Sequence, residues 1–427
     1  MEKIINALPR GTFSIASGMV VGAITGYVVV IKVNETVGTV PYAGFATFWS
    51  LIFVIGPGLF LPLEQEISRA ISHRNAHKDG SAPIVRVSTQ MAGILALIAV
   101  LVGASFSPIF IEHIFHNNSL LHIGFLIGIV SYGLLHCSRG VLSGNHKFGA
   151  YGSSLAAEGT IRFIAVLVLA NLGVTNVGYY GLAMGIAPIF AVLPFSFVIK
   201  KLTTSGSPAS KRELGTALGF LVTSSVLSQA LAYSSLFLTN VLEGESGPTA
   251  RYFTNAFFIA RIPVIGFMAV QAALLPKLSA YHARKNHKEF RHEFKKLLSL
   301  VLLLSVSGLA FIAIFGTSIG KLLFKADKFQ LSLSHFVILS LGSCIFLIAQ
   351  TLLQACIALQ QYKIVTIAYI FGVITTIISS IFFVSTDLPT TLWVSLSFSL
   401  GCVIVVAILW YEYEKTIESL VKAELNN

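Results

Sequence analysis

Long, uninterrupted apolar segments recur along this chain and restrict its fold more than any other feature of the sequence. A helix needs about 20 apolar residues to cross the hydrocarbon core of a bilayer, and twelve segments of the 427-residue chain reach about that length. Because backbone N–H and C=O groups find no water in lipid, each such segment is expected to form an α-helix. The predicted membrane helices are 13–33, 42–63, 87–107, 119–138, 150–171, 179–199, 214–241, 252–275, 297–316, 331–355, 364–384 and 390–411.

The overall composition excludes a soluble globular domain. Only 11% of the residues are charged and 55% are apolar, whereas roughly 25% of the residues in a soluble domain carry charge. Twelve membrane helices would use roughly 240 residues, which leaves little chain for a domain outside the membrane. The predicted fold class is therefore an all-α polytopic membrane protein.

The positive charges are distributed unevenly between the two sets of loops. Alternate loops, counted from the N-terminus, hold 22 of the 29 Lys and Arg residues, and the remaining loops hold five. Basic loops face the cytoplasm, so both termini are predicted to be cytoplasmic. The net charge of +11 then reflects contact with anionic lipid, and nucleic acid is not expected as a partner. The cluster Lys321, Lys325 and Lys328 is the exception on the outer side.

The two halves of the chain resemble each other. His77–Lys78–Asp79 corresponds to His287–Lys288–Glu289 at an offset of 210, and five of the six helix starts match within four residues at this offset. Six crossings per half make this a parallel repeat, in which substrate binds between the halves near the midplane. The predicted units are a first six-helix bundle (1–199), a polar cytoplasmic linker (200–213) and a second bundle with a short tail (214–427).

Sequence motifs for catalysis are missing from the chain. Gly316–Lys321 lacks the spacing of a Walker A motif, and no GxSxG, HExxH or paired-acid motif stands out. The outer-loop residues Glu112, His113 and His116 lack the further ligands that a metal site requires. We therefore predict a transporter without a metal or cofactor, not an enzyme. A membrane glycosyltransferase or polymerase remains an alternative, and the short outer loops argue against it.

Arginine residues within the apolar segments are the strongest candidates for function. A charge near the bilayer centre costs about 2.5–3.5 kcal/mol on insertion scales, so it needs a partner or a wet cavity. Arg261 is predicted to lie near the midplane, and Pro263 frees a backbone carbonyl beside it. A guanidinium there suits phosphate oxygens. The alternative is that Arg261 forms a structural pair with an acid on another helix.

Four further charged residues are candidates with alternatives. Glu158 and Arg162 lie four residues apart on one helix face, so they either form a pair that eases insertion or have separate roles. In the second case Glu158 binds the coupling ion and Arg162 contacts the substrate. Arg251, near the outer mouth, is predicted to guide an anionic headgroup. Arg10 either binds substrate or anchors the first helix at the inner face.

A stripe of small residues runs along the first predicted helix. Ser14, Gly18, Gly22 and Gly26 recur every four residues, a pattern that lets a neighbouring backbone approach closely. We expect this face to pack against another helix, with sliding during transport as a functional alternative.

Several motifs together resemble a known transporter family. They are Arg10–Gly22 (RGTFSIASGMVVG), Tyr42–Leu51 (YAGFATFWSL), Gly58–Arg69 (GLFLPLEQEISR), Leu142–Tyr151 (LSGNHKFGAY) and Arg261–Ser279 (RIPVIGFMAVQAALLPKLS). In order and spacing they resemble the Wzx-type polysaccharide flippases of the MOP (MATE-like) exporter superfamily.

This resemblance implies two six-helix bundles that form a V around a cationic cavity. It implies a flippase of undecaprenyl-pyrophosphate-linked oligosaccharides in the bacterial plasma membrane, driven by membrane potential or a cation gradient. Membrane lipids and polysaccharide polymerase or assembly proteins are the implied partners. A MATE-like drug or metabolite exporter is the alternative within transporters. Twelve predicted helices, where the lipid II flippase branch has fourteen, lead us to expect a chain outside that branch.

Overall fold

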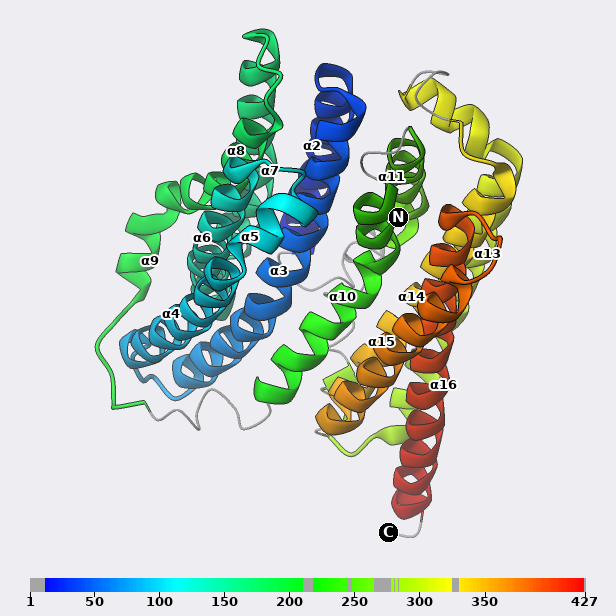
Figure 1. Cartoon of the computed structure of the whole chain (residues 1–427). Helices are drawn as coiled ribbons and strands as arrows, with labels where there is room; N and C mark the ends of the chain where they lie inside the picture. The colour runs from blue at the N-terminus through cyan, green and yellow to red at the C-terminus, as the bar shows by residue number, and fades with distance from the viewer. Residues whose placement is uncertain are drawn as a thin grey trace. The chain divides into compact units, whose positions relative to one another are not determined.

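Every regular element in the described part of the chain is helical (Figure 1). The computed structural model describes residues 12–209, 218–243, 248–264, 278–279, 281–282, 284–324 and 330–425. Within these ranges eleven helices are long and apolar enough to cross a membrane. The predicted helix at 252–275 is described only in its first part. The prediction of an all-helical, multi-pass membrane protein is thereby confirmed.

The chain divides into two compact units, Met1–Gln229 and Ala230–Asn427. The first unit holds α2 (Thr12–Thr36), α3 (Thr39–Ala76), α4 (Ala82–Ser105), α5 (Ser107–Ile109), the π-helix η1 (Phe110–Ile114), α6 (Ser119–Gly144), α7 (Phe148–Asn171), α8 (Val177–Val192), the 3-10 helix η2 (Leu193–Phe195) and α9 (Ser196–Leu202). The helix α10 (Leu218–Glu243) crosses the boundary. The second unit continues with α11 (Thr249–Ala260), α13 (His287–Phe324), α14 (Leu333–Ala358), α15 (Tyr362–Val384) and α16 (Thr390–Leu425).

The same packing pattern occurs in both units. In the first unit α6 packs against α4 and α8, and in the second unit α14 packs against α13 and α16. The helix pairs α7–α8 and α15–α16 correspond in the same way. This correspondence follows the order of the sequence repeat. The predicted linker at 200–213 begins inside α9, and only residues 203–209 of it are described outside a helix.

The small-residue stripe of α2 packs against α7, as predicted. A Cβ atom added to Gly18 would lie 2.1 Å from the carbonyl oxygen of Gly152, and one added to Gly159 would lie 2.8 Å from Cα of Gly22. The two backbones therefore pass so closely that only glycine fits at these positions. Sliding of the two helices along this contact during transport stays a prediction.

The outward faces of several helices are apolar, because they face lipid and not water. Leu303 and Val306 on α13 are more than 60% exposed, as are Ile378 and Ile381 on α15. A soluble protein rarely exposes contiguous apolar surface of this kind. The exposed apolar side chains of these spans therefore identify the surface that contacts the bilayer.

Three helices extend well beyond their predicted ends. α3 continues to Ala76, α6 to Gly144 and α16 to Leu425 (Figure 1). The predicted ends marked where the apolar run stops, but helix-forming polar residues such as Glu, Gln, Lys and Arg continue the backbone hydrogen bonding outside the hydrocarbon core. The most important consequence is that Arg139, which we expected in a loop, lies inside α6.

Candidate functional site

A buried cluster of charges joins α6 and α7 in the first unit. Arg139 Nη2 donates to Glu158 Oε2 at 2.7 Å, and Arg162 donates to the other carboxylate oxygen, Glu158 Oε1. All three residues are less than 10% exposed. Two guanidinium groups therefore share one carboxylate. We name these three residues the α6–α7 ion cluster.

Neutral groups hold the two arginines of this cluster in place. Arg139 Nε donates to Ser154 Oγ at 3.1 Å, and Arg162 Nη2 donates to the Tyr132 hydroxyl at 2.6 Å. The Arg162 guanidinium also lies 5.8 Å from the Phe53 ring centroid, within the range of a cation–π contact. Its Nε is buried and has no hydrogen-bond partner among the described residues. Arg162 thus retains an unused donor.

A second buried acid lies next to the cluster on α3. Glu64 Oε1 accepts a hydrogen bond from the Tyr151 hydroxyl at 2.6 Å, and Glu64 Oε2 lies 2.6 Å from His136 Nδ1. Glu64 is only 4% exposed. Glu64 is thus a buried residue, and the exposed Arg69 further along α3 forms an ion pair with Glu66. The two carboxylates of this region, Glu64 and Glu158, thus lie beside two buried arginines, Arg139 and Arg162.

Arg261 is the buried cation of the second unit. It follows the last residue of α11, is 8% exposed, and donates through Nη1 to the carbonyl oxygen of Ala232 at 2.9 Å. Its guanidinium carbon lies 4.8 Å from the ring centroid of Tyr233, 5.2 Å from Phe257 and 5.5 Å from Phe346. Cation–π contacts with these three rings fix the plane of the guanidinium.

Arg261 differs from the arginines of the first unit in its partners. Among the described residues its only hydrogen-bond partner is a backbone carbonyl, and no carboxylate forms an ion pair with it. The alternative that it forms a structural pair with an acid on another helix therefore finds no support in the part of the chain that the structure describes. A buried guanidinium without a counter-charge is a site where an anion is stabilised.

The remaining predicted site residues fall in different places. Glu158 and Arg162 form the expected pair four residues apart on α7. Arg251 lies in the first turn of α11 and is partly buried. Arg10 lies outside the described residues, as do Lys325 and Lys328 of the outer basic cluster. The roles assigned to these residues in binding and ion coupling stay predictions.

Sequence reasoning missed two members of the buried network, His136 and Arg139. His136 lies in the last turn of the predicted helix 119–138, and Arg139 directly follows it, where a charged residue usually belongs to a loop or to the interface. The available signal was their spacing, because His136 and Arg139 lie three residues apart and continue the face of Tyr132. Among the described residues, no group of three or more His, Cys, Asp or Glu side chains is arranged to hold a metal ion.

Comparison with known proteins places this geometry in context. The family model described as lipid II flippase MurJ matches residues 69–425. An uncharacterized protein of Mycobacterium tuberculosis is 24% identical over 180 residues, and one of Mycobacterium bovis matches equally. These matches cover 39% of this chain and 40% of the length of each relative.

Solved structures of MATE proteins and of another MOP superfamily transporter have the same fold. A MATE protein in its straight conformation superposes with a TM-score of 0.74 at 16% identity, covering 97% of this chain and 96% of that one. A MOP superfamily transporter from Pyrococcus furiosus, described as having a binding pocket of reversed polarity, superposes with a TM-score of 0.72 at 15% identity and covers 96% of both chains. At this identity the likeness concerns the fold alone.

Proposed function

The chain belongs to the family of the lipid II flippase MurJ, and we propose that it moves a lipid-linked anionic substrate across the membrane. Membership corrects our expectation, based on a count of twelve helices, that the chain lies outside the lipid II flippase branch. The family model matches from the end of α3 to the end of α16. Family membership therefore rests on this match in sequence and not on the number of membrane helices. The family is one of flippases, in agreement with the prediction of a transporter and not an enzyme.

The proposal rests on the surroundings of the Arg261 side chain. A fixed guanidinium, buried directly after α11 and flanked by three aromatic rings, has no carboxylate partner among the described residues. Charge buried in this way is costly unless an opposite charge compensates it. A phosphate or pyrophosphate head supplies that charge and matches the planar donor pattern of arginine. Arg261 is therefore the proposed contact for the anionic head.

The α6–α7 ion cluster provides a second cation that can be released. When Arg162 turns from Glu158 toward a substrate, Arg139 still neutralises the Glu158 carboxylate at 2.7 Å. Removing the only partner of a buried charge costs about 3–5 kcal/mol, and the second arginine avoids that cost. Arg162 also has an unpartnered Nε to offer. We assign to Arg139 the role of keeping Glu158 satisfied while Arg162 contacts substrate.

The finer identity of the substrate is also a proposal. Following the motif resemblance, we propose that it is an undecaprenyl-pyrophosphate-linked oligosaccharide for cell-surface polysaccharide, carried across the bacterial plasma membrane by alternating access. Arg251 and Arg10 would guide the head at the two mouths, and Glu158 would couple transport to an ion. A polysaccharide polymerase is the proposed partner, and the proposed location of both termini is the cytoplasm.

Export of cationic drugs is the competing function within transporters, and the described charges do not favour it. Such a substrate needs an available carboxylate. Glu158 is engaged by two arginines, and Glu64 by Tyr151 and His136. No observation in the described spans therefore favours this alternative.

A transport assay with reconstituted protein tests the proposal. Purified protein in liposomes receives a fluorescent undecaprenyl-pyrophosphate-linked sugar, and a membrane-impermeant quencher reports its movement between leaflets. We expect transport by the wild type, and a loss of about tenfold or more in Arg261→Ala. Arg69→Ala is the matched control, because it removes an exposed guanidinium at the end of a span and should leave the rate unchanged. Absence of transport by the wild type, or equal rates in Arg261→Ala, would contradict the proposal.

A further inference from the structure

One nitrogen of a buried histidine lacks a partner beside the α6–α7 ion cluster. His136 on α6 is 4% exposed, and its Nδ1 lies 2.6 Å from Glu64 Oε2. The other ring nitrogen, Nε2, is buried and has no hydrogen-bond partner among the described residues. Buried polar atoms without a partner are rare in native proteins, so this nitrogen requires a physical explanation.

The hydrogen bonds around Glu64 determine which atom of the group can gain a proton. Two acceptors do not approach to 2.6 Å without a proton, so one proton lies between His136 Nδ1 and Glu64 Oε2. The Tyr151 hydroxyl donates to the other oxygen, Glu64 Oε1. Hard metal cations require several free oxygen ligands, which Glu64 does not offer. Nε2 of His136 is therefore the atom that can take up or lose a further proton.

The charged and titratable groups around His136 belong to three helices. They are Glu64 from α3, Tyr132 and Arg139 from α6, and Tyr151 and Glu158 from α7. The other elements packed against α6 are η1, α4, α8 and α9, and in the described part of the chain none of them presents an interacting titratable side chain to His136. Histidine is the side-chain type in this set whose ordinary charge change falls near neutral pH.

Tyr132 connects His136 to Arg162 through direct contacts. The rings of Tyr132 and His136 stack with their centroids 5.8 Å apart, and the Tyr132 hydroxyl accepts a hydrogen bond from Arg162 Nη2 at 2.6 Å. His136 also lies within electrostatic range of Glu158, the carboxylate that Arg162 shares with Arg139. A charge on His136 therefore acts on the ion cluster itself.

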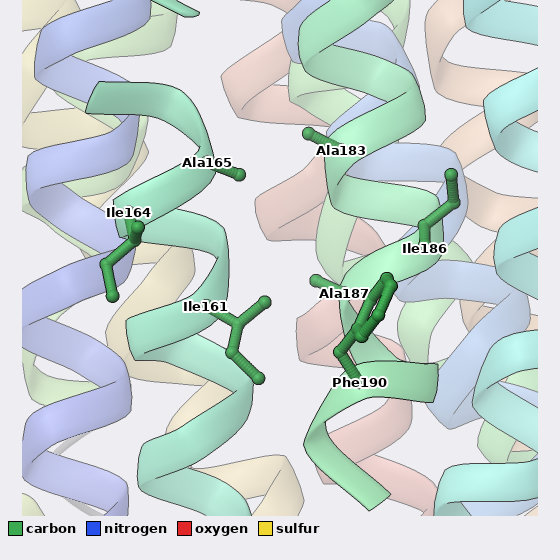
Figure 2. Close-up of a pocket in the computed structure, with 7 residues that line it drawn as sticks. All are labelled: Ile161, Ile164, Ala165, Ala183, Ile186, Ala187 and Phe190. Atoms are coloured by element: carbon green, nitrogen blue, oxygen red, sulfur yellow. The ribbon is translucent and has the colours of Figure 1, made fainter. Parts of the chain in front are cut away.

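The side of α7 that faces α8 is apolar. Figure 2 shows Ile161 and Ala165 directed toward α8, and the side chains that line the space between the two helices are all apolar. This side gives Arg162 no counter-charge among the described residues. The charge of Arg162 is therefore compensated by Glu158 alone, so any change in the charge around Glu158 changes how firmly Arg162 is held.

A proton on Nε2 adds one positive charge next to a carboxylate that two arginines already share. The resulting imidazolium supplies part of the compensation that Arg162 gives to Glu158, so Arg162 leaves Glu158 at a lower cost. The added buried charge also requires an anion nearby, and the head of the substrate supplies one.

We propose that Nε2 of His136 is a proton-binding site, and that the proton and the anionic head of the substrate bind together. This inference rests on the proposed function and adds the ion to which Arg162 responds. Glu158 takes part in the coupling without binding the proton itself, because both of its oxygens accept hydrogen bonds from arginines. By linkage, the proton raises the affinity for the head by the same factor as the head raises the affinity for the proton.

Calorimetry on the wild-type protein tests this linkage. Binding of an undecaprenyl-pyrophosphate-linked sugar is measured in two buffers of different ionisation enthalpy, which gives the number of protons taken up. The pyrophosphate diester has no group that titrates near neutral pH, so any uptake belongs to the protein. We expect proton uptake at pH 7 and binding about tenfold tighter at pH 5.5 than at pH 8.5, within the usual range of coupling between two sites. Binding without proton uptake and with equal affinity at both pH values would overturn the proposal while the proposed function stands.

Replacing the histidine locates the proton. His136→Gln keeps a donor for Glu64 and removes the proton site, so we expect its binding to be independent of pH and free of proton uptake. His122→Gln is the matched control, because His122 is another buried histidine of α6, bonded to Ser107 near the opposite end of the helix. It should keep the wild-type pH profile. Proton uptake that persists in His136→Gln would place the proton elsewhere and overturn the proposal.

A second variant keeps the test decisive if His136→Gln does not fold. Glu64→Gln retains His136 but removes the carboxylate that stabilises the imidazolium, so the midpoint of the pH profile should move to lower pH. An unchanged midpoint would overturn the proposal. If the wild type does not bind the pyrophosphate lipid at any pH, the proposed function itself fails.

Discussion

Arg139 on α6 contacts Glu158 on α7 at 2.7 Å, although Glu158 already has an arginine partner on its own helix. The carboxylate is thus bound by one arginine within its helix and by another across the helix interface. The pair within the helix joins two charges on one face of α7, whereas the pair across the interface joins α6 to α7. The first arginine is therefore free to exchange partners without leaving Glu158 uncompensated.

Replacing Arg139 separates these two roles. In Arg139→Ala, Glu158 retains only Arg162, so we expect a loss of about 2 kcal/mol in stability and a transport rate reduced about tenfold. Thermal unfolding in detergent and the liposome assay measure the two effects. Arg139→Lys keeps the charge and should recover part of both. If Arg139→Ala unfolds like the wild type and transports at its rate, the assigned role of Arg139 is wrong.

The hydroxyl of Tyr151 offers a milder perturbation of the same region. Tyr151→Phe removes the hydrogen bond to Glu64 and leaves a buried carboxylate oxygen with one partner fewer, at a cost of about 1–3 kcal/mol. The melting temperature measures this loss. Tyr411→Phe removes a hydroxyl from an exposed tyrosine and should have no effect. Equal melting temperatures for both variants would show that the Tyr151–Glu64 contact contributes nothing.

The close contact between α2 and α7 predicts a steric result. In Gly152→Ala the new Cβ would lie 2.0 Å from the carbonyl oxygen of Ser14, so the helices must separate, at a cost of about 1–3 kcal/mol or more. Gly93→Ala is the control, because nothing lies within 4 Å of its added Cβ and alanine favours the helix. In a thermal unfolding measurement, we expect a lower melting temperature for Gly152→Ala and no decrease for Gly93→Ala. A neutral Gly152→Ala would contradict the observed packing.

The segment after α9 is held by Asp79, which predicts a pH dependence. Hydrogen bonds from the Ser207 hydroxyl and from its backbone N–H, the latter at 2.9 Å, lower the pKa of Asp79 below its ordinary value of 3.8. The charged form is therefore the one that binds, so this contact is complete above about pH 4 and is lost as the pH falls through the lowered pKa.

Hydrogen exchange of residues 203–209 measures this contact. We expect protection at pH 7 that disappears in Asp79→Ala, and a wild type that loses protection in acid. Asp387→Ala removes an exposed carboxylate elsewhere and should leave residues 203–209 unchanged. Protection that is independent of pH and of Asp79 would show that other contacts hold the segment.

The apolar runs predicted the helices well because a membrane leaves the backbone no alternative. Helix ends were predicted poorly, since the residues beyond Leu63 in α3 and beyond Tyr411 in α16 are polar yet still form helix. Hydropathy measures where the hydrocarbon core ends and not where the hydrogen bonding ends.

The candidate site was predictable only where partners share one helix. The spacing of Glu158 and Arg162 is visible in the sequence, and the pair is present. Glu64 and His136 are 72 positions apart in the sequence, and Arg139 and Glu158 are 19 positions apart. A single sequence does not specify which helices pack together, so these contacts could not be predicted. The aromatic cage of Arg261, which combines residues of α10, α11 and α14, is hidden for the same reason.

The central claim is that a buried guanidinium binds an anionic lipid head, and a comparison of two ligands tests it most directly. Binding to the purified protein is measured for an undecaprenyl-pyrophosphate-linked sugar and for a neutral undecaprenyl glycoside with the same tail and sugar. We predict that the wild type binds the pyrophosphate lipid at least tenfold more tightly, about 1.4 kcal/mol, and that Arg261→Ala loses most of this difference. Equal affinities of the wild type for the two lipids, or a preference that survives in Arg261→Ala, would contradict the account.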